Sequence, residues 1–438
     1  MGLVRFHAFE HGEWVLTSAV DMAPSPIGVR FMGVTLAQVR AILVWLMFAA
    51  SFYVAVEPAP SDLLFLVVLA CFLNSGLAIS ATVVPFVLFL LLYNLGGFIS
   101  FLQVADDEKA RMFVITSFYM AFSAIFLAFY VAHDPPRRMA IIKNALVIAA
   151  VIASLLGILG YFDIAGLGGA FSQNMRAASA FKDPNVFATY LIFPGVMLVQ
   201  GFLLGTQRQK FVSIVGLFII MAALFLAFSR GAWISFLVSS IMVVALNFLL
   251  TPAMQTRRRI VLITVSGAIG LAVLLAILLS VEGIRDLFMD RFTLVKDYDS
   301  GEKGRFGNQL NSIPILLELP LGFGPFQFPK IYGMAPHNVY INAFASYGWL
   351  GGISYFLLMI STIIIGFKTV LMRTPWQNWA IVVFCPLVAT MFQGVQIDTD
   401  HWRHFYWMLG MMWGLFAASM QLRYFGNGSN RGSRLHSA

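Results

Sequence analysis

The stretch "FVSIVGLFIIMAALFLAFSRGAWISFLVSSIMVVALNFLL", residues 211–250, contains a single charged residue, Arg230. A helix needs roughly 20 apolar residues to cross the hydrocarbon core of a bilayer, so the stretch is long enough for two crossings. The break between them falls at "SRGAW", residues 229–233. The sequence therefore predicts a helical hairpin in a membrane, with Arg230 at its tip.

The whole chain has the same apolar character. Of its 438 residues 60% are hydrophobic and 11% are charged, and its mean hydropathy is +0.84. A soluble fold cannot bury that much apolar surface in one core. The apolar runs 211–228 and 260–281 do not alternate with polar residues as the strands of a membrane β-barrel do. Cys71 and Cys385 each lie inside an apolar run and predict neither a disulfide framework nor a metal site. The composition indicates an all-α polytopic membrane protein.

Apolar runs predict about 12 transmembrane helices. The predicted spans are 34–56, 63–79, 81–102, 112–131, 139–162, 186–204, 211–228, 232–250, 260–281, 339–367, 379–395 and 405–422. The chain then divides into a cytoplasmic N-terminal segment at 1–33, nine helices within 34–281, one long periplasmic loop at 282–337, three helices within 338–424 and a cytoplasmic tail at 425–438.

The charge distribution predicts the orientation. With the N-terminus in the cytoplasm, 16 of the 28 basic residues and only four of the 20 acidic residues lie on the inner side. Basic residues are enriched in cytoplasmic loops, so we expect both termini inside and the long loop outside.

Three arginines on the predicted outer side, Arg176, Arg230 and Arg305, are candidates for binding phosphate. A guanidinium offers a planar fork that matches a phosphate, and a diphosphate needs more than one such group. A charge placed near hydrocarbon is costly and usually faces a cavity, a partner or a ligand. The alternatives are three unrelated solvated charges and, for Arg230, an extended side chain that reaches the lipid phosphates.

A histidine closes the long loop in "GMAPHNVYIN", residues 333–342. His337 can take a proton near neutral pH and is a candidate general base for a sugar hydroxyl. Pro336 stiffens the chain before it, and Asn338 can orient it by a hydrogen bond. The alternative is an interfacial histidine that caps the next helix.

Helix-start signals occur in "AFKDPNVFATYL", residues 180–191, where Asp183 suits the N-cap and Pro184 the first helical position. Capping does not account for Lys182, which we take with Arg176 and Asn338 as a candidate substrate-binding residue.

Two further stretches lie near the outer side. In "GRFGNQLNSIPILLELP", Leu310, Ile313, Leu316 and Leu317 share one helical face, and Pro314 should kink this helix or mark its start. The stretch "DTDHWRHFYW", residues 398–407, is interpreted as an interfacial aromatic belt with solvated charges.

Four stretches in order resemble the O-antigen ligase and O-antigen polymerase superfamily. They are "SAFKDPNVFATYL", "AFSRGAWISF", "GRFGNQLNSIPILLELPLGFGPFQF" and "APHNVYINAFASYGWLGG", within residues 170–367. The resemblance implies an inner-membrane glycosyltransferase of the GT-C type with its active site facing the periplasm. It implies a donor glycan on undecaprenyl diphosphate, an acceptor that is a glycan or lipid A–core, and neither cofactor, metal nor nucleic acid.

The family's histidine maps onto His337, its hairpin arginine onto Arg230, and the arginine that starts its loop helix onto Arg305. Where many relatives carry a tryptophan in the first turn of that helix, this chain has "FGNQ". The resemblance predicts an inverting transfer, in which the arginines stabilise the leaving diphosphate and His337 activates or orients the acceptor.

Two reactions fit this resemblance: polymerisation of exopolysaccharide or O-antigen repeats, which we favour slightly, and ligation to lipid A–core. A transporter or a flippase of a lipid-linked glycan is the alternative from another class. Transporters usually contain related halves and charges at mid-membrane. This chain has no similarity between its halves, and its charges lie at the outer boundary.

Overall fold

The computed structural model describes residues 34–73, 80–291 and 304–435, together with three short strands near the N-terminus. The rest of the predicted segment 1–33, the break between helices near residue 80 and part of the long loop fall outside the described residues. The helices are α1 Leu36–Ala49, α2 Pro60–Leu73, α3 Val84–Phe101, α4 Glu108–His133, α5 Pro135–Tyr161, α6 Gly168–Phe171, α7 Pro184–Leu204, α8 Gln207–Leu226, α9 Arg230–Leu250, α10 Met254–Leu279, α11 Glu282–Arg291, α12 Arg305–Glu318, α13 Phe328–Tyr332, α14 Val339–Leu371, α15 Gln377–Gln393 and α16 Arg403–Leu435.

Sheet structure within the described residues is confined to short pairs of antiparallel strands. They are β1 Arg5–Ala8 with β2 Trp14–Thr17, β3 Arg30–Phe31 with β4 Val34–Thr35, and β5 Ser172–Gln173 with β6 Arg176–Ala177. The prediction of an all-α polytopic membrane protein is therefore confirmed.

Eight helices of the described residues are long and apolar enough to cross a membrane: α3, α4, α5, α7, α8, α9, α10 and α14. The shorter helices α1, α2 and α15 are also apolar. The total of 12 spans and the GT-C type stay predictions. Helix α16 continues to Leu435, so part of the predicted tail 425–438 is helical.

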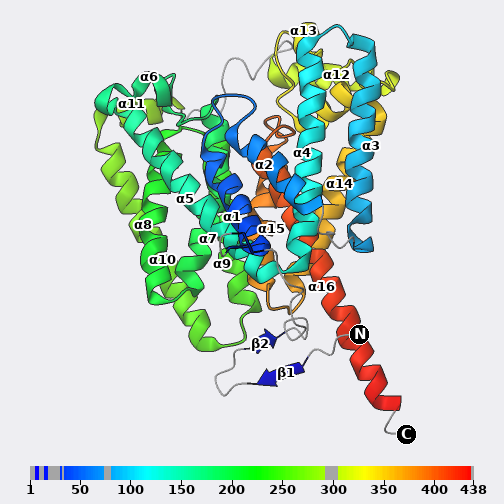
Figure 1. Cartoon of the computed structure of the whole chain (residues 1–438). Coiled ribbons are helices and arrows are strands. Elements are labelled where there is room, and N and C mark those ends of the chain that lie inside the picture. The colour runs from blue at the N-terminus through cyan, green and yellow to red at the C-terminus, as the bar shows by residue number, and fades with distance from the viewer. Residues whose placement is uncertain are drawn as a thin grey trace.

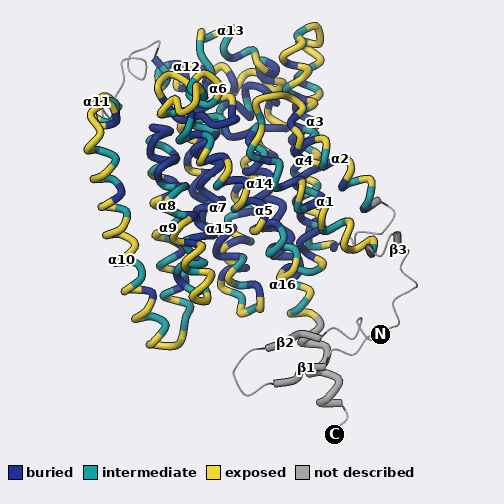
Figure 2. Tube along the Cα trace, turned by 60° about the vertical axis from the view of Figure 1, so that its left-hand side comes forward, coloured by how far each residue is buried: buried dark blue, intermediate teal, exposed yellow. Residues whose placement is uncertain are grey.

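The bundle has a packed centre and a loosely packed edge. In the most apolar 18-residue stretch of each helix, 78% of the residues are buried in α7 but only 11% in α10. Figures 1 and 2 show α10 at the outside of the bundle, with exposed residues along its length. A helix that is apolar and exposed suits contact with lipid, because hydrocarbon does not penalise exposed apolar side chains.

The predicted helical hairpin and the predicted start of α7 are confirmed, although α8 begins and ends earlier than predicted and α9 begins two residues earlier. Helix α8 ends at Leu226 and α9 begins at Arg230, so the stretch 211–250 forms two helices with a short connection. At the start of α7, Asp183 is the N-cap, its side chain accepts hydrogen bonds from the next turn, and Pro184 is the first helical residue.

The long segment between α10 and α14 is ordered in part, as expected. It contains α11, α12 and α13, and these lie with α6 at one end of the bundle (Figure 1). Pro314 lies inside α12 and does not mark its start.

The apolar side of α12 faces outward. Leu310 and Leu317 are 68% and 67% exposed, whereas the polar residues Asn308, Gln309 and Ser312 are buried. Leu316 is the exception on the predicted apolar face, because it is buried in a cluster with Phe328 and Ala345. The helix therefore packs on the protein through Leu316 and its polar side.

Helix α14 is interrupted near its start by the segment that follows α12. Gly348 has φ +63°, and an added Cβ there would lie 2.5 Å from the carbonyl oxygen of Pro320. The backbone N–H of Trp349 donates to this oxygen, and the N–H of Phe323 donates to the carbonyl of Ala345. These bonds attach the loop after α12 to the first part of α14, which begins directly after His337.

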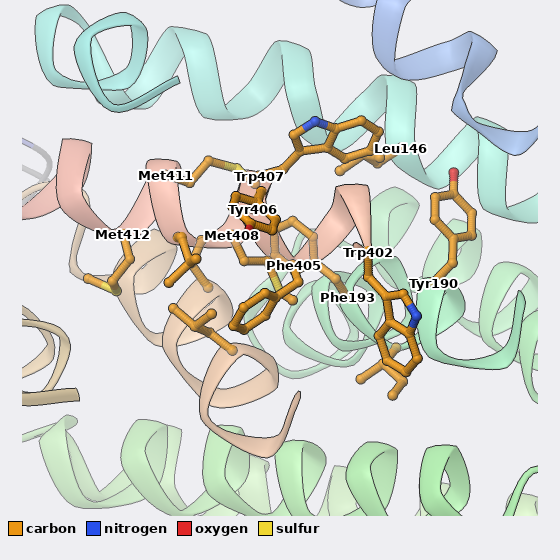
Figure 3. Close-up of a cluster of buried hydrophobic side chains, with 14 of the residues drawn as sticks. Leu146, Tyr190, Phe193, Trp402, Phe405, Tyr406, Trp407, Met408, Met411 and Met412 are labelled. Carbon is orange, nitrogen blue, oxygen red and sulfur yellow. The ribbon is translucent and has the colours of Figure 1, made fainter. Parts of the chain in front are cut away.

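The interpretation of residues 398–407 as a solvated interfacial belt is wrong. Asp400, Trp402, His404 and Tyr406 are all buried. Figure 3 shows the aromatic side chains at the start of α16 packed among neighbouring helices. The charged groups are paired inside the protein: Arg403 donates to both carboxylate oxygens of Asp62 at 2.8 and 2.7 Å. Sequence alone cannot distinguish such a buried polar segment from an interfacial one, because both combine charges with aromatic residues.

Candidate functional site

The connection between α15 and α16, residues 394–402, is the element on which the candidate site is built. The backbone N–H of Val339 donates to the carbonyl of Gly394, which attaches the first turn of α14 to this connection. Its side chains and carbonyls also contact the starts of α9 and α12, as described below. We call residues 393–402, which are the last residue of α15 and the connection that follows it, the α15–α16 linker.

His337 is held in a backbone conformation that is unusual for its residue type. Its φ is +47°, in the left-handed region. Such strained residues persist only where the surroundings hold them, and they concentrate at functional sites. Here the backbone N–H of His337 donates to Oδ2 of Asp398 at 3.1 Å, and the N–H of Asn338 donates to Oδ1 at 3.0 Å. One carboxylate thus fixes the turn that presents the imidazole, which is partly exposed.

The helix cap at the start of α14 is Asn338. Its side-chain oxygen accepts from the N–H groups of Tyr340 and Ile341 at 3.1 and 3.2 Å. The alternative role considered for His337, capping of this helix, therefore belongs to its neighbour. Asn338 supports the position of His337 through the backbone, with its own Oδ1 engaged in the cap.

The electrostatic state of Asp398 is unusual for a carboxyl group. Burial and the nearby charge of Asp400 raise its pKa to about 7, although the two backbone N–H donors lower it. Asp400 is itself bound by the amide of Asn342 at 3.0 Å and lies 3.3 Å from Nδ1 of His401. The linker carboxylates thus form a largely buried polar network beside the turn that holds His337.

Arg305 reaches the same linker from α12. It is the first residue of the helix, and its Nη1 donates to the carbonyl of Gln396 at 3.4 Å. Its guanidinium also lies over the ring of Phe306, 4.7 Å from the centroid. The side chain is partly exposed and so is accessible to a ligand.

The polar side of α12 also holds the chain that leads to His337. Gln309 donates through Nε2 to the carbonyl of Pro336 at 2.7 Å, and Asn308 donates to the carbonyl of Tyr332 at 3.3 Å. Buried amide side chains are placed where they can pair with backbone groups, since an unpaired polar group in the interior is costly. This accounts for the inward polar face of α12: the helix positions both Arg305 and the histidine turn.

The start of α9, where Arg230 lies, packs against the linker. Arg230 is the first residue of that helix and is partly exposed. A Cβ added at the adjacent Gly231 would lie 3.1 Å from Nε2 of Gln393. Gln393 itself joins three helices, because Nε2 donates to Thr189 of α7 and Oε1 accepts from Ser235 of α9.

Arg230 and Arg305 share a second property. Neither of the preceding residues, Ser229 and Gly304, makes a side-chain capping bond to its helix. The first N–H groups of a helix carry partial positive charge and bind anions readily. Each arginine therefore lies beside a helix end that favours an anion.

Two other predicted site residues make their contacts elsewhere. Arg176 is buried, and it donates to the carbonyl of Ala227 and to Oδ1 of Asn185, both at 2.7 Å. Lys182 forms an exposed ion pair with Glu57 at 2.9 Å. The bond from Arg176 attaches β6 to the end of α8, and the ion pair of Lys182 attaches the loop before α7 to the loop before α2. The contacts of Arg305, His337 and Asn338 are instead with the linker.

The sequence did not predict that Asp398 positions another residue. Asp398 and Asp400 form an acidic pair directly before a predicted span, and this pair could have indicated such a role, but both were interpreted as solvated charges. Among the described residues no group of three His, Cys, Asp or Glu side chains is arranged to hold a metal ion.

Part of the chain matches a known protein family. Residues 215–356 match the family model described as O-antigen ligase, Wzy_C. The matched region runs from α8 into α14 and contains Arg230, Arg305 and His337. It confirms the resemblance to the O-antigen ligase and polymerase superfamily. No curated protein matches the chain.

Proposed function

We propose that this membrane protein of the O-antigen ligase and polymerase type transfers a glycan from undecaprenyl diphosphate to an acceptor hydroxyl on the periplasmic side of the inner membrane. The acceptor is a sugar of a growing glycan in polymerisation or of lipid A–core in ligation. Both reactions need the same chemistry at the donor, and they differ only in what supplies the hydroxyl.

The observation that carries this proposal is the convergence on the α15–α16 linker. His337 is held by Asp398, Arg305 bonds to Gln396, and the start of α9 lies against Gln393. The starts of α14, α12 and α9 are three separate parts of the chain, and the linker contacts all three. A general base beside two arginines at helix N-termini suits a reaction in which a hydroxyl loses a proton and a diphosphate leaves.

In the proposed step the acceptor oxygen attacks the anomeric carbon of the donor sugar from the side opposite the diphosphate. The new C–O bond forms as the bond to the diphosphate oxygen breaks, so the configuration at that carbon is inverted. The proton of the acceptor hydroxyl passes to the imidazole of His337. Undecaprenyl diphosphate departs with its negative charge stabilised by Arg230 and Arg305.

We propose that this chemistry runs without a metal. A diphosphate is already a good leaving group, and two guanidinium groups with two helix ends supply positive charge where it develops. The carboxylates of the linker are engaged with backbone N–H groups, with Asn342 and with His401, and thus serve to orient the site.

The test of the proposal is transfer by the purified protein in proteoliposomes that contain a polyprenyl-diphosphate-linked glycan and a glycan acceptor. We expect a product with inverted anomeric configuration, release of the polyprenyl diphosphate, and activity that persists in chelator. Absence of transfer with either kind of acceptor, by a protein that still binds the donor, would contradict the enzyme assignment.

The two reactions are distinguished by the glycans of a strain that lacks the protein. Loss of long chains with retention of single repeats identifies a polymerase. Long chains that stay on the carrier lipid identify a ligase.

A further inference from the structure

A pocket of about 450 Å³ lies at the end of the bundle opposite the candidate site. Helix α14 begins near His337, and its part after the interruption at Gly348, residues 349–371, extends for about 34 Å at 1.5 Å per residue to this pocket. The lining residues come from the end of α14, the α14–α15 connection and α16; they are Lys368, Leu371, Met372, Arg373, Thr374, Ser419, Leu422 and Arg423.

The charged residues of this pocket all have the same sign. Lys368, Arg373 and Arg423 line it, and no carboxylate does. Among the described residues, none of the ion pairs involves these three cations. Like charges gathered around one cavity repel each other, and an anion in the cavity removes that cost.

The pocket is firmly built. Trp376 donates through Nε1 to Oγ of Ser419 at 2.8 Å, which attaches the α14–α15 connection to α16. Gln377 donates to the carbonyl of Val370 at 2.8 Å, which attaches the same connection to α14. Arg373 and Thr374 belong to the connection that these two bonds attach to α14 and α16.

An unused hydroxyl lies in the wall of the pocket. Within the part of the chain that the structure describes, the buried Oγ1 of Thr374 has no hydrogen-bond partner. A buried hydroxyl without a partner costs free energy, so it is a natural donor to a bound oxygen.

We propose that this pocket binds the phosphate group of an anionic phospholipid from the leaflet at that end of the bundle. The three cations and the Thr374 hydroxyl receive the phosphate. Leu371, Met372 and Leu422 line the same cavity and accept the glycerol backbone and the first methylene groups. A free phosphate would leave these apolar walls without a partner. This site is independent of the transfer reaction proposed above.

The test uses the full-length protein in detergent, with phosphatidylglycerol and phosphatidylcholine titrated separately and bound lipid counted by native mass spectrometry. We expect the wild type to retain one phosphatidylglycerol in preference to phosphatidylcholine. Each basic residue near a membrane surface contributes about 1 kcal/mol, so the double variant Arg373→Gln/Arg423→Gln should bind this lipid about 30-fold more weakly.

The matched control removes two positive charges from the same end of the bundle but outside the pocket, in Arg258→Gln/Arg259→Gln at the start of α10. The affinity of this variant for phosphatidylglycerol should stay within about threefold of that of the wild type. The two removed charges lie outside the pocket, and salt screens their long-range effect on a lipid bound there. The charge-conserving pair Arg373→Lys/Arg423→Lys should retain most of the binding, which separates loss of the site from misfolding.

Three results would overturn the proposal. One is an equal loss of binding in the pocket pair and the control pair. Another is the absence of any preference for phosphatidylglycerol over phosphatidylcholine. The third is displacement of phosphatidylglycerol by soluble glycerol 3-phosphate at equal concentration, which would identify a site for a free anion.

Discussion

Both carboxylate oxygens of Asp398 accept backbone N–H groups of the histidine turn, at 3.1 Å from His337 and 3.0 Å from Asn338. The two partners are about 60 residues apart in the chain, and His337 has a φ of +47°. A left-handed conformation at a residue with a side chain costs of order 1 kcal/mol or more, so it needs such support. Asp398 therefore holds the backbone from which the imidazole of His337 projects.

Asp398→Asn should lower turnover about 10- to 100-fold. An asparagine offers one acceptor oxygen and one N–H₂ donor in place of two acceptor oxygens. One backbone N–H of the turn then faces a donor and loses its hydrogen bond, so the turn changes its conformation. A buried donor without a partner costs about 1–3 kcal/mol. Transfer rates in proteoliposomes measure this, with Asp106→Asn, an exposed carboxylate at the same end, as the control. Full activity of Asp398→Asn would remove its positioning role.

Stability and activity should depend on pH in opposite directions. Burial and the charge of Asp400 raise the pKa of Asp398 to about 7, so the folded state favours the proton. Its contribution to stability is then complete below the ordinary carboxyl pKa of about 4 and is lost as pH rises through 7. The proposed transfer needs an ionised Asp398, which accepts both backbone N–H groups, and a neutral imidazole at His337. The rate of transfer should therefore rise over the same pH range. Unfolding temperatures of the wild type from pH 5 to 8 should fall relative to those of Asp398→Asn, and parallel curves would contradict this.

Local sequence signals predicted a large part of the fold. The 40-residue apolar stretch with one break gave two helices, and the Asp183-Pro184 pair marked the start of α7. These features depend on residues next to each other in the chain: length against bilayer thickness, and side chains that can cap. Arg230, Arg305 and His337 could be selected in the same way, by residue type at a span boundary and by resemblance.

The arrangement of the site could not be predicted from local signals. The linker depends on contacts between residues far apart in the chain, such as Arg305 with Gln396 and Asn342 with Asp400. Leu310, Ile313 and Leu317 of α12 are exposed, which reverses the usual rule that the apolar side of an amphipathic helix is buried, and of this face only Leu316 is buried. Its polar side is buried because Gln309 satisfies a backbone carbonyl beside His337, a partner that the helix sequence does not reveal.

His337→Gly should separate the role of the imidazole from that of the backbone. Glycine adopts a positive φ without steric cost, so the turn should keep its shape and the variant should stay as stable as the wild type within about 1 kcal/mol. Loss of a general base usually costs about 10²–10⁴-fold in turnover. Turnover and donor affinity, measured separately in the same preparation, test this. A loss confined to donor affinity would make His337 a ligand of the carrier lipid.

Arg176→Met should reduce stability more than it reduces activity. The guanidinium is buried and donates to Ala227 and Asn185, and hydrogen bonds from charged groups are worth about 1.5–3 kcal/mol each. We expect a lower unfolding temperature, with transfer per folded molecule within about threefold of the wild type. Lys182→Met is the comparison, since its exposed ion pair contributes at most about 1 kcal/mol. A fully stable Arg176→Met that binds donor weakly would restore Arg176 to the substrate site.

Arg230→Lys and Arg305→Lys test whether the two arginines hold one diphosphate. Lysine keeps the charge but lacks the planar fork that binds two phosphate oxygens at once, so each variant should lose about 10- to 100-fold in turnover and also bind donor more weakly. The control is Arg285→Lys on α11, an exposed arginine that lies 3.9 Å from Glu282. Because both groups act on the same leaving group, their effects should not be additive, and the double variant should fall short of the product of the single losses. An additive double variant would assign the arginines to separate ligands, and a fully active Arg230→Lys would place the diphosphate away from the start of α9.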